Sequence, residues 1–438
     1  MDVRMIRKLA AVAAVAFCLA AGPALANPHV GDIAARYVRL SLEIGEHEDG
    51  YIDAYYGPAA WQAEARASKR TLPELARDVD TLLADLQADA DDADVAGDTS
   101  GPLTHERIAF LKGQLIAART RLRMMQGEKL SFEDEAEGLF GVRPVLKPLA
   151  SYDSVLADIE TLVPGEGPLA DRVDAFNERF VVPADKLQAV MDAAIAECRR
   201  RTMAYIPLPA NERFTLEFVT DKSWSGYNWY KGDAHSLIQV NTDLPVRLSR
   251  AVDLGCHEGY PGHHVYNVLL EEHLSKGRGW VEFTVYPLYS PQSLLAEGSA
   301  NYGIDLAFPG DERLTFETKA LYPLAGLDPK DARRYLDLQE AQQTLSGARF
   351  TIASEYLAGR IDREAAIALT QKYGLVSRKR AEQTVSFSEQ YRSYVINYGL
   401  GQQMVRAFVE RAGPGQSERW ARMKTLLSTP STPADLAR

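Results

Sequence analysis

Apolar residues recur at helical spacing over most of this 438-residue chain. In segment 32–46, Ile33, Tyr37, Leu40 and Ile44 fall on one stripe, as expected for a helix with one buried face. Similar patterns predict helices over residues 72–86, 104–125, 151–162 and 183–202. Segment 88–102 is rich in Asp, Gly and small residues, and we expect a solvated linker there. The whole pattern predicts a mainly α fold.

The pattern changes between about residues 214 and 241. Segments 216–219 and 235–241 are typical of β-strands, and they flank a turn-like Gly226-Tyr227-Asn228 segment. This small sheet would lie directly before the histidine-rich segment described below. An exposed sheet edge there could hold an extended peptide through backbone hydrogen bonds; the alternative is a hairpin that only caps the helices.

The chain begins with a leader-like segment. Three basic residues precede an apolar run and an Ala-x-Ala site at 24–26, which is typical of a signal peptide over residues 1–26. Phe17 stands before Cys18, where a lipid-attachment site would need a small residue, so a lipoprotein is disfavoured. Export of this kind implies a periplasmic or secreted bacterial protein.

We interpret residues 27–438 as one helical metallohydrolase region, with an N-terminal helical part at 27–205 and a metal-site part at 206–438. No later segment approaches ~18 consecutive apolar residues, so we expect no membrane association after signal cleavage. Removal of the leader takes away three basic residues and one acidic residue, which changes the formal charge from −11 to −13. That charge disfavours nucleic acid and anionic lipid as partners. The sequence does not indicate an oligomeric state.

Segment 255–264, Gly-Cys-His-Glu-Gly-Tyr-Pro-Gly-His-His, holds three of the eight histidines. His257 and Glu258 begin a pattern in which two imidazoles bind zinc and the intervening Glu takes a proton from water that the metal activates. In the common spacing the second His stands four residues after the first, on the same helix face. Here that position is Pro261, which has no ligand atom.

His263 and His264 remain as candidates for the second ligand. In an unbroken helix a residue seven positions on lies about 10 Å along the axis. Two nitrogens about 2.0–2.1 Å from one zinc ion are at most about 4 Å apart. A bulge at Pro261-Gly262 would return His263 to the ligand position. We therefore favour His263 and keep His264 as the alternative ligand, or as a residue that orients substrate or supports a ligand.

A third ligand is expected from another element, and Glu297 is the best candidate. Its neighbours are apolar or small, and a carboxylate is rarely buried in such a setting without a partner. We expect Gly298 and Ala300 to let this helix approach the helix of the first ligand closely. Asn301 or Asp305 could then accept a hydrogen bond from a ligand His. The alternative for Glu297 is a core salt bridge with an arginine.

Two cysteines remain after the leader, Cys198 and Cys256. They could pair in an oxidising compartment. A cysteine beside a metal-binding His is more often a small buried core residue, so we favour free thiols over a disulfide.

The chain resembles a bacterial family called domain of unknown function 885 over roughly residues 30–410, and three motifs carry the resemblance: His257-Glu258-x-x-Pro261-Gly262-His263-His264, Glu297-Gly298-x-Ala300-x-Tyr302 and Tyr398-x-x-Gly401-Gln402. The resemblance implies a large helical zincin-like fold with the small β-sheet next to the metal-binding helix. It also implies a gluzincin-like zinc peptidase, distantly similar to angiotensin-converting enzyme and the helical carboxypeptidases. Arg392-Ser393-Tyr394 replaces an expected Pro-Gly-Gln, and Ser299 replaces an expected aromatic residue. These departures bear on substrate preference and not on the ligands.

The mechanism implied is hydrolysis at zinc held by His257, His263 and Glu297, where the pKa of a bound water falls to about 7. Glu258 would accept the water's proton and pass it to the leaving amine. This assignment makes Glu258 the general base and zinc the expected cofactor.

The oxyanion that forms during hydrolysis needs a hydrogen-bond donor. Tyr391, Tyr394 and Tyr398 share one helix face, and Tyr398 matches the family's position, so we choose Tyr398. We expect the other two to form an aromatic core stripe. His235 and His264 are alternative donors.

We predict an exported zinc peptidase with a peptide substrate. A zinc hydrolase of another amide or ester, and a noncatalytic metal- or ligand-binding protein, are the alternatives. A structural zinc site does not require Glu258, which argues against a noncatalytic role. Four basic residues could bind a substrate carboxylate but are typical of solvated helix faces: Arg360, Arg363, Lys379 and Arg380.

Overall fold

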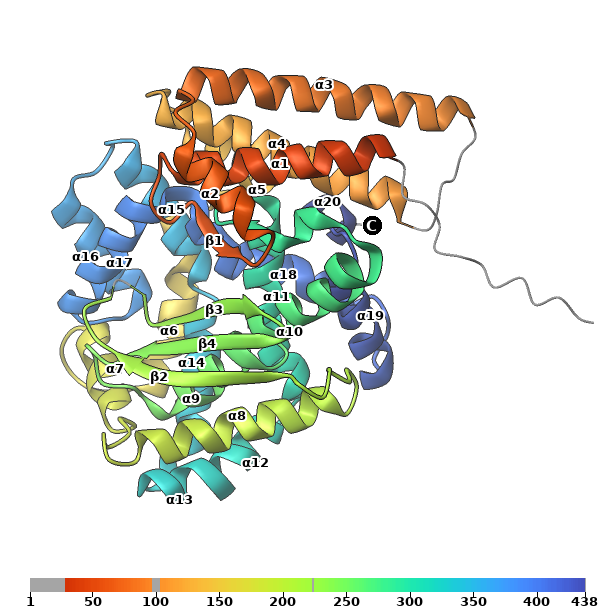
Figure 1. Cartoon of the computed structure of the whole chain (residues 1–438). Helices are drawn as coiled ribbons and strands as arrows, with labels where there is room; N and C mark the ends of the chain where they lie inside the picture. Colours follow the sequence, from red (N-terminus) through yellow and green to blue (C-terminus); the bar gives the residue numbers. More distant parts are fainter. Residues whose placement is uncertain (1–27, 97–102, 223, 438) are drawn as a thin grey trace, which may run out of the picture.

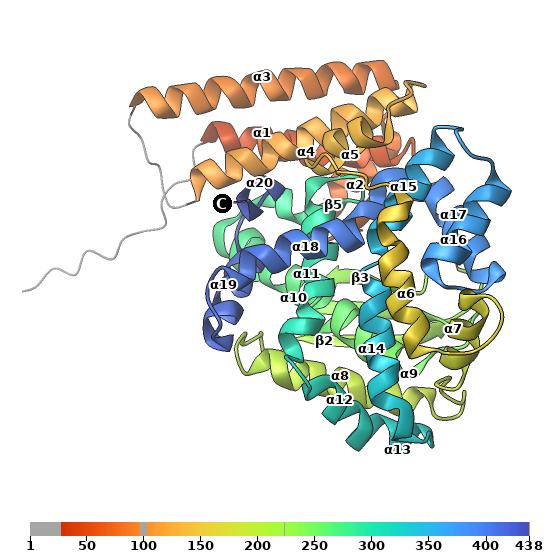
Figure 2. The ribbon, with the colours of Figure 1, turned by 180° about the vertical axis from the view of Figure 1, so that it is seen from behind.

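The computed structural model describes residues 28–96, 103–222 and 224–437, so the predicted signal peptide at 1–26 lies outside the described residues. Helices make up 68% of the structure, and the strands form two small sheets. The predicted mainly α fold is therefore confirmed. In Figures 1 and 2 the helices pack around one three-stranded sheet.

The first part of the chain, up to residue 205, is mainly helical. Its elements are α1 (Pro28–Gly45), β1 (Ile52–Tyr55), α2 (Ala59–Ala67), α3 (Leu72–Ala96), α4 (Thr104–Met125), α5 (Phe132–Phe140), η1 (Leu149–Tyr152), α6 (Asp153–Leu162), α7 (Leu169–Glu178) and α8 (Leu187–Met203). The helices predicted from periodicity are confirmed, and the predicted segment 104–125 matches α4 at both ends. Helices α1, α3 and α4 lie side by side at the upper end of the molecule in Figure 1.

The predicted linker at 88–102 is wrong in its first part. Helix α3 continues through this segment to Ala96, and residues 97–102 lie outside the described residues. Leu82 and Leu86 belong to a buried stripe on α3, which packs against α4. Ala and Asp do not interrupt a helix that such packing stabilises, so composition placed the helix end too early.

The second part of the chain carries the three-stranded sheet. Its elements up to residue 325 are β2 (Arg213–Val219), β3 (Gly226–Gly232), β4 (His235–Asn241), α9 (Leu248–Leu254), η2 (Gly255–Gly259), α10 (His263–Leu270), η3 (Glu271–Lys276), η4 (Val281–Thr284), β5 (Val285–Pro287), α11 (Pro291–Ala307), α12 (Glu312–Phe316), η5 (Glu317–Leu321) and α13 (Tyr322–Ala325). From residue 329 they are η6 (Pro329–Asp331), α14 (Ala332–Gln343), α15 (Ser346–Leu357), α16 (Arg363–Gly374), α17 (Arg378–Tyr391), η7 (Arg392–Val395), α18 (Ile396–Glu410), α19 (Gln416–Ser428) and α20 (Pro433–Leu436).

The strand order in the larger sheet is β2-β4-β3, with β4 parallel to β2 and antiparallel to β3. The prediction of a turn at 226–228 is wrong, because this segment begins β3. The Gly and Asn that suggested a turn have other roles. Gly226 lies against the Glu258 side chain, and Asn228 Nδ2 donates to the Glu258 carbonyl over 2.7 Å. A second, antiparallel sheet joins β1 to β5.

Helices α11 and α18 cross with their backbones in contact. A Cβ atom added to Gly298 would lie 2.5 Å from the carbonyl carbon of Gly401. The sequence suggested that Gly298 brings α11 toward the helix that carries His257. The structure shows that Gly298 instead brings α11 close to α18. Gly303 has the suggested role, because a Cβ atom there would lie 2.7 Å from Cγ of Pro261.

One hydrophobic core runs through both the 27–205 part and the 206–438 part. The cluster of buried side chains extends from Val30 of α1 to Leu436 of α20, and it includes Leu115, Leu254 and Tyr302. The two parts therefore stabilise each other through shared apolar burial.

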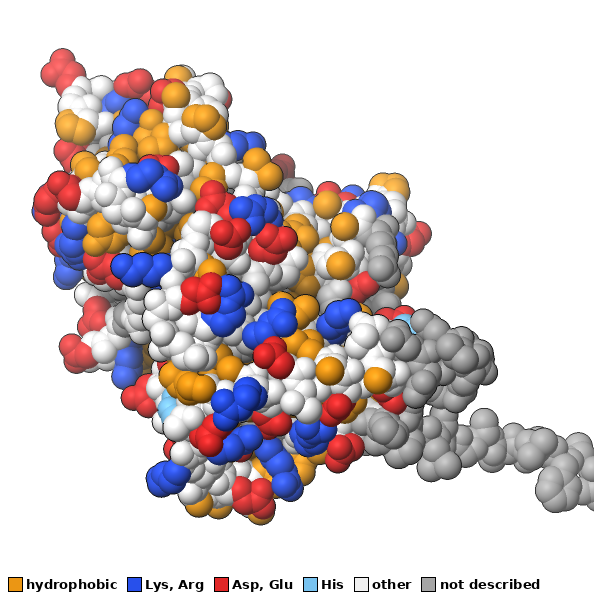
Figure 3. Space-filling model, turned by 90° about the horizontal axis from the view of Figure 1, so that it is seen from above, with side chains coloured by type: hydrophobic (Ala, Val, Ile, Leu, Met, Phe, Trp, Pro, Cys, Tyr) orange, Lys and Arg blue, Asp and Glu red, His pale blue; other side chains and the backbone are white. Residues whose placement is uncertain are grey.

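The molecular surface seen from above mixes acidic and basic side chains, with no broad field of one sign (Figure 3). Such a mixture on this face offers no strip of positive charge for a polyanion. Within the described residues, no helix is long and apolar enough to cross a bilayer.

We predict that Gly298→Ala lowers the free energy of unfolding by about 1–3 kcal/mol, because the added methyl group would push α11 away from α18. Denaturant unfolding of the purified protein measures this change. Gly113→Ala in α4 is the matched control, since its methyl group would only touch Pro291 Cγ at 3.5 Å. That substitution should be neutral or stabilising by up to about 1 kcal/mol. Equal effects of the two substitutions would contradict the crossing contact.

Candidate metal centre

The helix that carries His257 ends in a π-helical turn and a new helix begins at His263. The Tyr260 amide donates to Gly255 O over 3.2 Å, and the Gly262 amide donates to Cys256 O over 3.0 Å. The Tyr260–Pro261 peptide bond is cis. A Cβ atom on residue 262 would lie 1.7 Å from the His257 carbonyl oxygen, so only glycine fits there. The predicted bulge is thus a complete break between two helices.

This break brings the predicted ligand atoms together. His263 Nε2 lies 3.1 Å from His257 Nε2, and Glu297 Oε2 lies 3.2 Å from His257 Nε2 and 3.7 Å from His263 Nε2. Ligand atoms about 2.0–2.1 Å from a tetrahedral zinc ion stand about 3.3 Å apart. The three groups therefore fit a zinc ion at their centre.

Glu297 is ionised in a buried setting. Burial raises its pKa, but the imidazoles of His257 and His263 outweigh that effect and hold the pKa well below its ordinary value. Glu297 Oε2 is buried and accepts no hydrogen bond within the described chain. Burial lowers the pKa of His263, yet the neighbouring carboxylates, Glu297 above all, raise it to about 9. A buried acceptor that faces two imidazoles is a suitable site for a cation.

Asn301 orients the first imidazole. Its Oδ1 lies 3.1 Å from His257 Nδ1, and its Nδ2 donates to the Tyr398 carbonyl over 3.2 Å. The second bond fixes which end of the amide faces the ring, so Oδ1 accepts the proton on Nδ1 and Nε2 is left to bind a metal. The sequence offered Asn301 or Asp305 for this role. Asp305 instead accepts from Arg406 and Gln402.

The tyrosines of the predicted stripe lie beside the centre. The Tyr394 hydroxyl donates to Glu297 Oε1 over 2.8 Å, so this residue is more than the core packing that the sequence suggested. The Tyr398 ring lies 5.9 Å from the Tyr394 ring. Burial raises the pKa of both hydroxyls well above the ordinary value, so both remain protonated donors. Tyr398 and Tyr391 line the cavity described below.

The structure places His264 away from the three ligand atoms. Its ring is fully buried, with Nδ1 2.8 Å from Ser236 Oγ and Nε2 3.0 Å from Glu212 Oε1. Glu212 also accepts from Arg199 over 2.9 Å and from the Tyr260 hydroxyl. The alternative of His264 as a metal ligand is therefore wrong, because successive residues at the start of a helix point in different directions.

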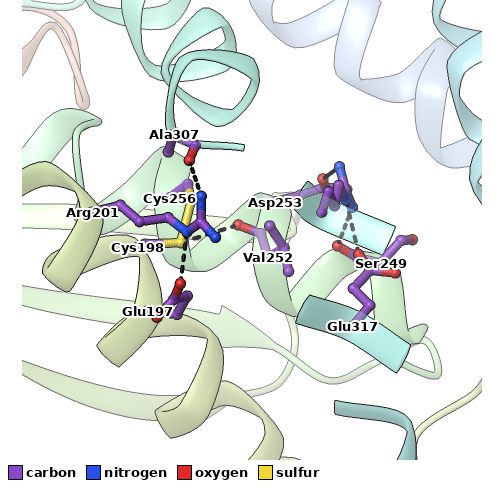
Figure 4. Close-up of a disulfide and its surroundings, with 10 residues drawn as sticks. Glu197, Cys198, Arg201, Ser249, Val252, Asp253, Cys256, Ala307 and Glu317 are labelled. Atoms are coloured by element: carbon purple, nitrogen blue, oxygen red, sulfur yellow. Dashed lines mark hydrogen bonds and ion pairs between the residues drawn. A yellow bond between two sulfur atoms is a disulfide. The ribbon is translucent and has the colours of Figure 1, made fainter. Parts of the chain in front are cut away.

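Cys198 and Cys256 form a disulfide, so the expectation of free thiols is wrong. Their Cα atoms lie 5.4 Å apart although 58 residues separate them in sequence. The bond joins α8 to the residue before His257 (Figure 4). Arg201, also on α8, donates to the Ala307 carbonyl at the end of α11 over 2.8 Å. Helix α8 therefore holds both ligand-bearing segments.

A cavity of about 840 Å³ opens onto the three ligand atoms. Glu258 lines it and is only 4% exposed. Its Oε1 would lie 2.8 Å from a Cβ atom on Gly226. Among the described residues, no donor bonds to its carboxylate, which leaves this group able to accept a proton from the cavity. The other donors proposed from sequence, His235 and His264, do not line the cavity.

Sequence reasoning missed several charged residues of the cavity, and two of them bear on its chemistry, Asp53 and Arg349. Asp53 lies on β1 and accepts from the Tyr227 hydroxyl. Burial raises its pKa to about 6, although the Tyr227 hydrogen bond lowers it. Both residues are distant in sequence from the histidine-rich segment, and neither stands in a motif. The four basic residues considered from sequence do not line the cavity: Arg360, Arg363, Lys379 and Arg380.

No protein-family model and no curated protein matches the chain. Among solved structures, a "putative lipoprotein" from Colwellia psychrerythraea aligns with a TM-score of 0.53 at 16% identity, over 88% of this chain and 79% of that chain. A "putative lipoprotein of unknown function" from Shewanella oneidensis aligns with a TM-score of 0.39 at 15% identity, over 84% of this chain and 75% of that chain. The first of these likenesses shows a shared fold.

We predict that His263→Ala abolishes stoichiometric zinc binding, whereas His264→Asn retains one zinc ion per chain. Loss of a supporting partner alone typically weakens binding about 10–100-fold, so loss of a ligand should weaken it more. Equilibrium dialysis against zinc, followed by metal analysis, measures both. Equal retention by the two variants would reject the ligand set.

We predict that Glu212→Gln lowers the free energy of unfolding by about 2 kcal/mol at neutral pH, through loss of charged hydrogen bonds. Burial raises the Glu212 pKa, but bonds from His264, Tyr260 and Arg199 lower it to about 2. The ionised form thus stabilises the fold above the ordinary pKa of about 4.3, and this stabilisation is lost as the pH falls toward 2.

Urea unfolding of the wild-type protein and the Glu212→Gln variant between pH 3 and pH 7 tests this prediction. The difference between their free energies of unfolding should become smaller as the pH falls. Exposed Glu217 on β2 is the matched control. Glu217→Gln should change stability by less than about 0.5 kcal/mol at any of these pH values. A difference for Glu212→Gln that does not depend on pH would contradict the assigned ionisation.

Proposed function

We propose that this protein is an exported zinc-dependent peptidase. The observation that carries the proposal is the joint placement of two imidazoles, one carboxylate and a separate free carboxylate at one cavity. Only a hydrolytic site needs the fourth group, Glu258, because three ligands already satisfy a metal that keeps an open position.

Each residue has a role in hydrolysis. His257, His263 and Glu297 hold zinc, which when bound supplies an activated water and polarises the scissile carbonyl. Glu258 accepts the proton from the attacking water and delivers it to the leaving nitrogen. The Tyr398 hydroxyl donates to the oxygen on which negative charge develops. Tyr394 and Asn301 keep Glu297 and His257 in position through the hydrogen bonds described above.

A peptide substrate is supported by the cavity wall. Residues 224–229 line the cavity, and most of them belong to β3, which pairs with β4 on one side only. The other edge of β3 pairs with no strand in the described chain, although β1 packs beside it. An extended chain could add to this unpaired edge through backbone hydrogen bonds, whatever its side chains are. An ester or another amide would use the same metal chemistry without this contact, so the edge strand favours a peptide.

Two further observations support the proposal. The motifs on which the sequence resembles domain of unknown function 885 include every residue assigned above to zinc, to proton transfer and to the oxyanion, and the resemblance implies a zincin-like fold. The Cys198–Cys256 disulfide suits a periplasmic or secreted protein, because disulfides persist in oxidising compartments.

We predict that Glu258→Gln reduces peptide hydrolysis by about 100-fold or more while zinc stays bound, because the water loses its proton acceptor. Mass spectrometry of a diverse peptide mixture, with and without chelator and zinc add-back, measures the activity. Glu340→Gln is the matched control, since Glu340 lines the same cavity and takes no part in the centre.

Wild-type cleavage that stops with chelator and returns with zinc would support the proposal. No cleavage of any peptide by zinc-loaded wild-type protein would reject a peptidase. Full activity of the Glu258→Gln variant would reject Glu258 as the base.

A further inference from the structure

Arg349 is a cationic residue of the cavity that the proposed mechanism does not use. It lies in the first turn of α15 and lines the same cavity as Glu258 and Glu297. Its side chain is half-buried. The Phe387 ring covers one face of its guanidinium, with Cζ 5.0 Å from the ring centroid.

The Arg349 guanidinium has no carboxylate partner within the described chain. Its Nε is buried and makes no hydrogen bond. Other arginines of the cavity differ, since Arg250 and Arg313 pair with Asp253 at 3.4 Å and 2.9 Å. A guanidinium stays charged even when burial lowers its pKa, because the ordinary value is above about 12. A charge kept partly out of water without a counterion is costly, which points to an anionic ligand.

Neutral polar side chains line the cavity on the helices near Arg349, together with the acidic Glu340 and Asp305. Gln343 Nε2 donates to Gln402 Oε1 over 2.9 Å, and Ser346 and Tyr398 also line this side. The unpaired carboxylate of Asp53 lies on β1, next to the edge strand. Glu258 and Glu297 lie at the metal centre. An anionic group that enters the cavity is therefore attracted toward the Arg349 guanidinium on α15.

A row of aromatic rings connects Arg349 with the metal centre. Phe387 lies 6.2 Å from Tyr398 between ring centroids, and Tyr398 lies 5.9 Å from Tyr394, whose hydroxyl donates to Glu297. The side chains of this wall carry no charge. A substrate that lies along it would present one end to the guanidinium and a bond closer to its middle to the ligand atoms.

We propose that Arg349 binds the C-terminal carboxylate of the substrate, so that the protein removes residues from the C-terminal end of short peptides. A guanidinium pairs with a carboxylate through two parallel hydrogen bonds, which fixes direction as well as position. Arg349 is thus a specificity-determining residue. This inference rests on the proposed peptidase function and adds the polarity of its substrate.

The test compares two peptides of one sequence, one with a free C-terminal carboxylate and one with a C-terminal amide. We expect wild-type protein to cleave the free acid with a kcat/KM at least about 50-fold higher. Arg349→Gln should remove this preference by slowing cleavage of the acid while leaving the amide within about threefold. Arg349→Lys keeps the charge and should restore part of the preference.

Arg422→Gln is the matched control. Arg422 also stacks on a phenylalanine ring, with Cζ 4.2 Å from the Phe408 centroid, and its Nε is also buried without a partner. It does not line the cavity, so its substitution should preserve the preference. Equal cleavage of acid and amide by wild-type protein, or equal slowing of both by Arg349→Gln, would overturn the proposal.

A binding experiment separates this inference from the peptidase assignment. Titration calorimetry measures both peptides against zinc-loaded Glu258→Gln protein, with and without Arg349→Gln. Tighter binding of the acid that disappears with Arg349→Gln would support the carboxylate site even if no peptide is cleaved. Equal binding of acid and amide, or binding of neither, would overturn the carboxylate site even if the wild-type protein is a peptidase.

Discussion

The contact between residue 262 and the His257 carbonyl is the constraint on which the centre depends. No side chain fits at this position, so the backbone can fold directly over the end of the first helix. That fold places His263 Nε2 3.1 Å from His257 Nε2, although six residues separate them. Gly303 then lets α11 pack against Pro261, and α11 carries Glu297. The glycine at position 262 thus allows the backbone path that places the three ligand atoms together.

Two adjacent histidines acquire opposite roles because different carboxylates face them. His263 faces Glu297, whose second oxygen accepts from Tyr394, and both residues open onto the cavity. His264 faces Glu212, whose oxygens are occupied by Arg199 and Tyr260. A saturated network like that of Glu212 stabilises the fold, whereas the Glu297 cluster keeps one buried oxygen without a partner. The candidate site is therefore distinguished by a buried carboxylate oxygen that has no hydrogen-bond partner. The presence of a histidine alone does not distinguish it, because His264 lies in a saturated network.

Local patterns predicted the helices and the ligand candidates, because periodicity and spacing act over a few residues. The period of 3.6 predicted α4 at both ends, and the spacing argument selected His263 over His264. Periodicity and spacing could not predict contacts between segments that are distant in sequence. The disulfide needs α8 to lie on η2, and the Gly298 contact needs α18, about a hundred residues later. Arg349 had no signal at all, since a charged residue near a helix start is ordinary until its neighbours are known.

The charge balance of the cavity gives an independent argument for a cation. Some of its acidic groups are neutralised, as Asp305 is by Arg406 and Asp253 by Arg313. Several lining carboxylates pair with no lysine or arginine in the described chain: Asp49, Asp53, Glu258, Glu297 and Glu340. Burial is the main cause that raises the pKa of Asp53, and the nearby charges of Glu297 and Glu258 raise it further. A divalent cation would offset this excess, and the two imidazoles would complete its ligands. The same cation would reduce the net negative charge of the cavity, so binding of metal and of a carboxylate substrate would favour each other.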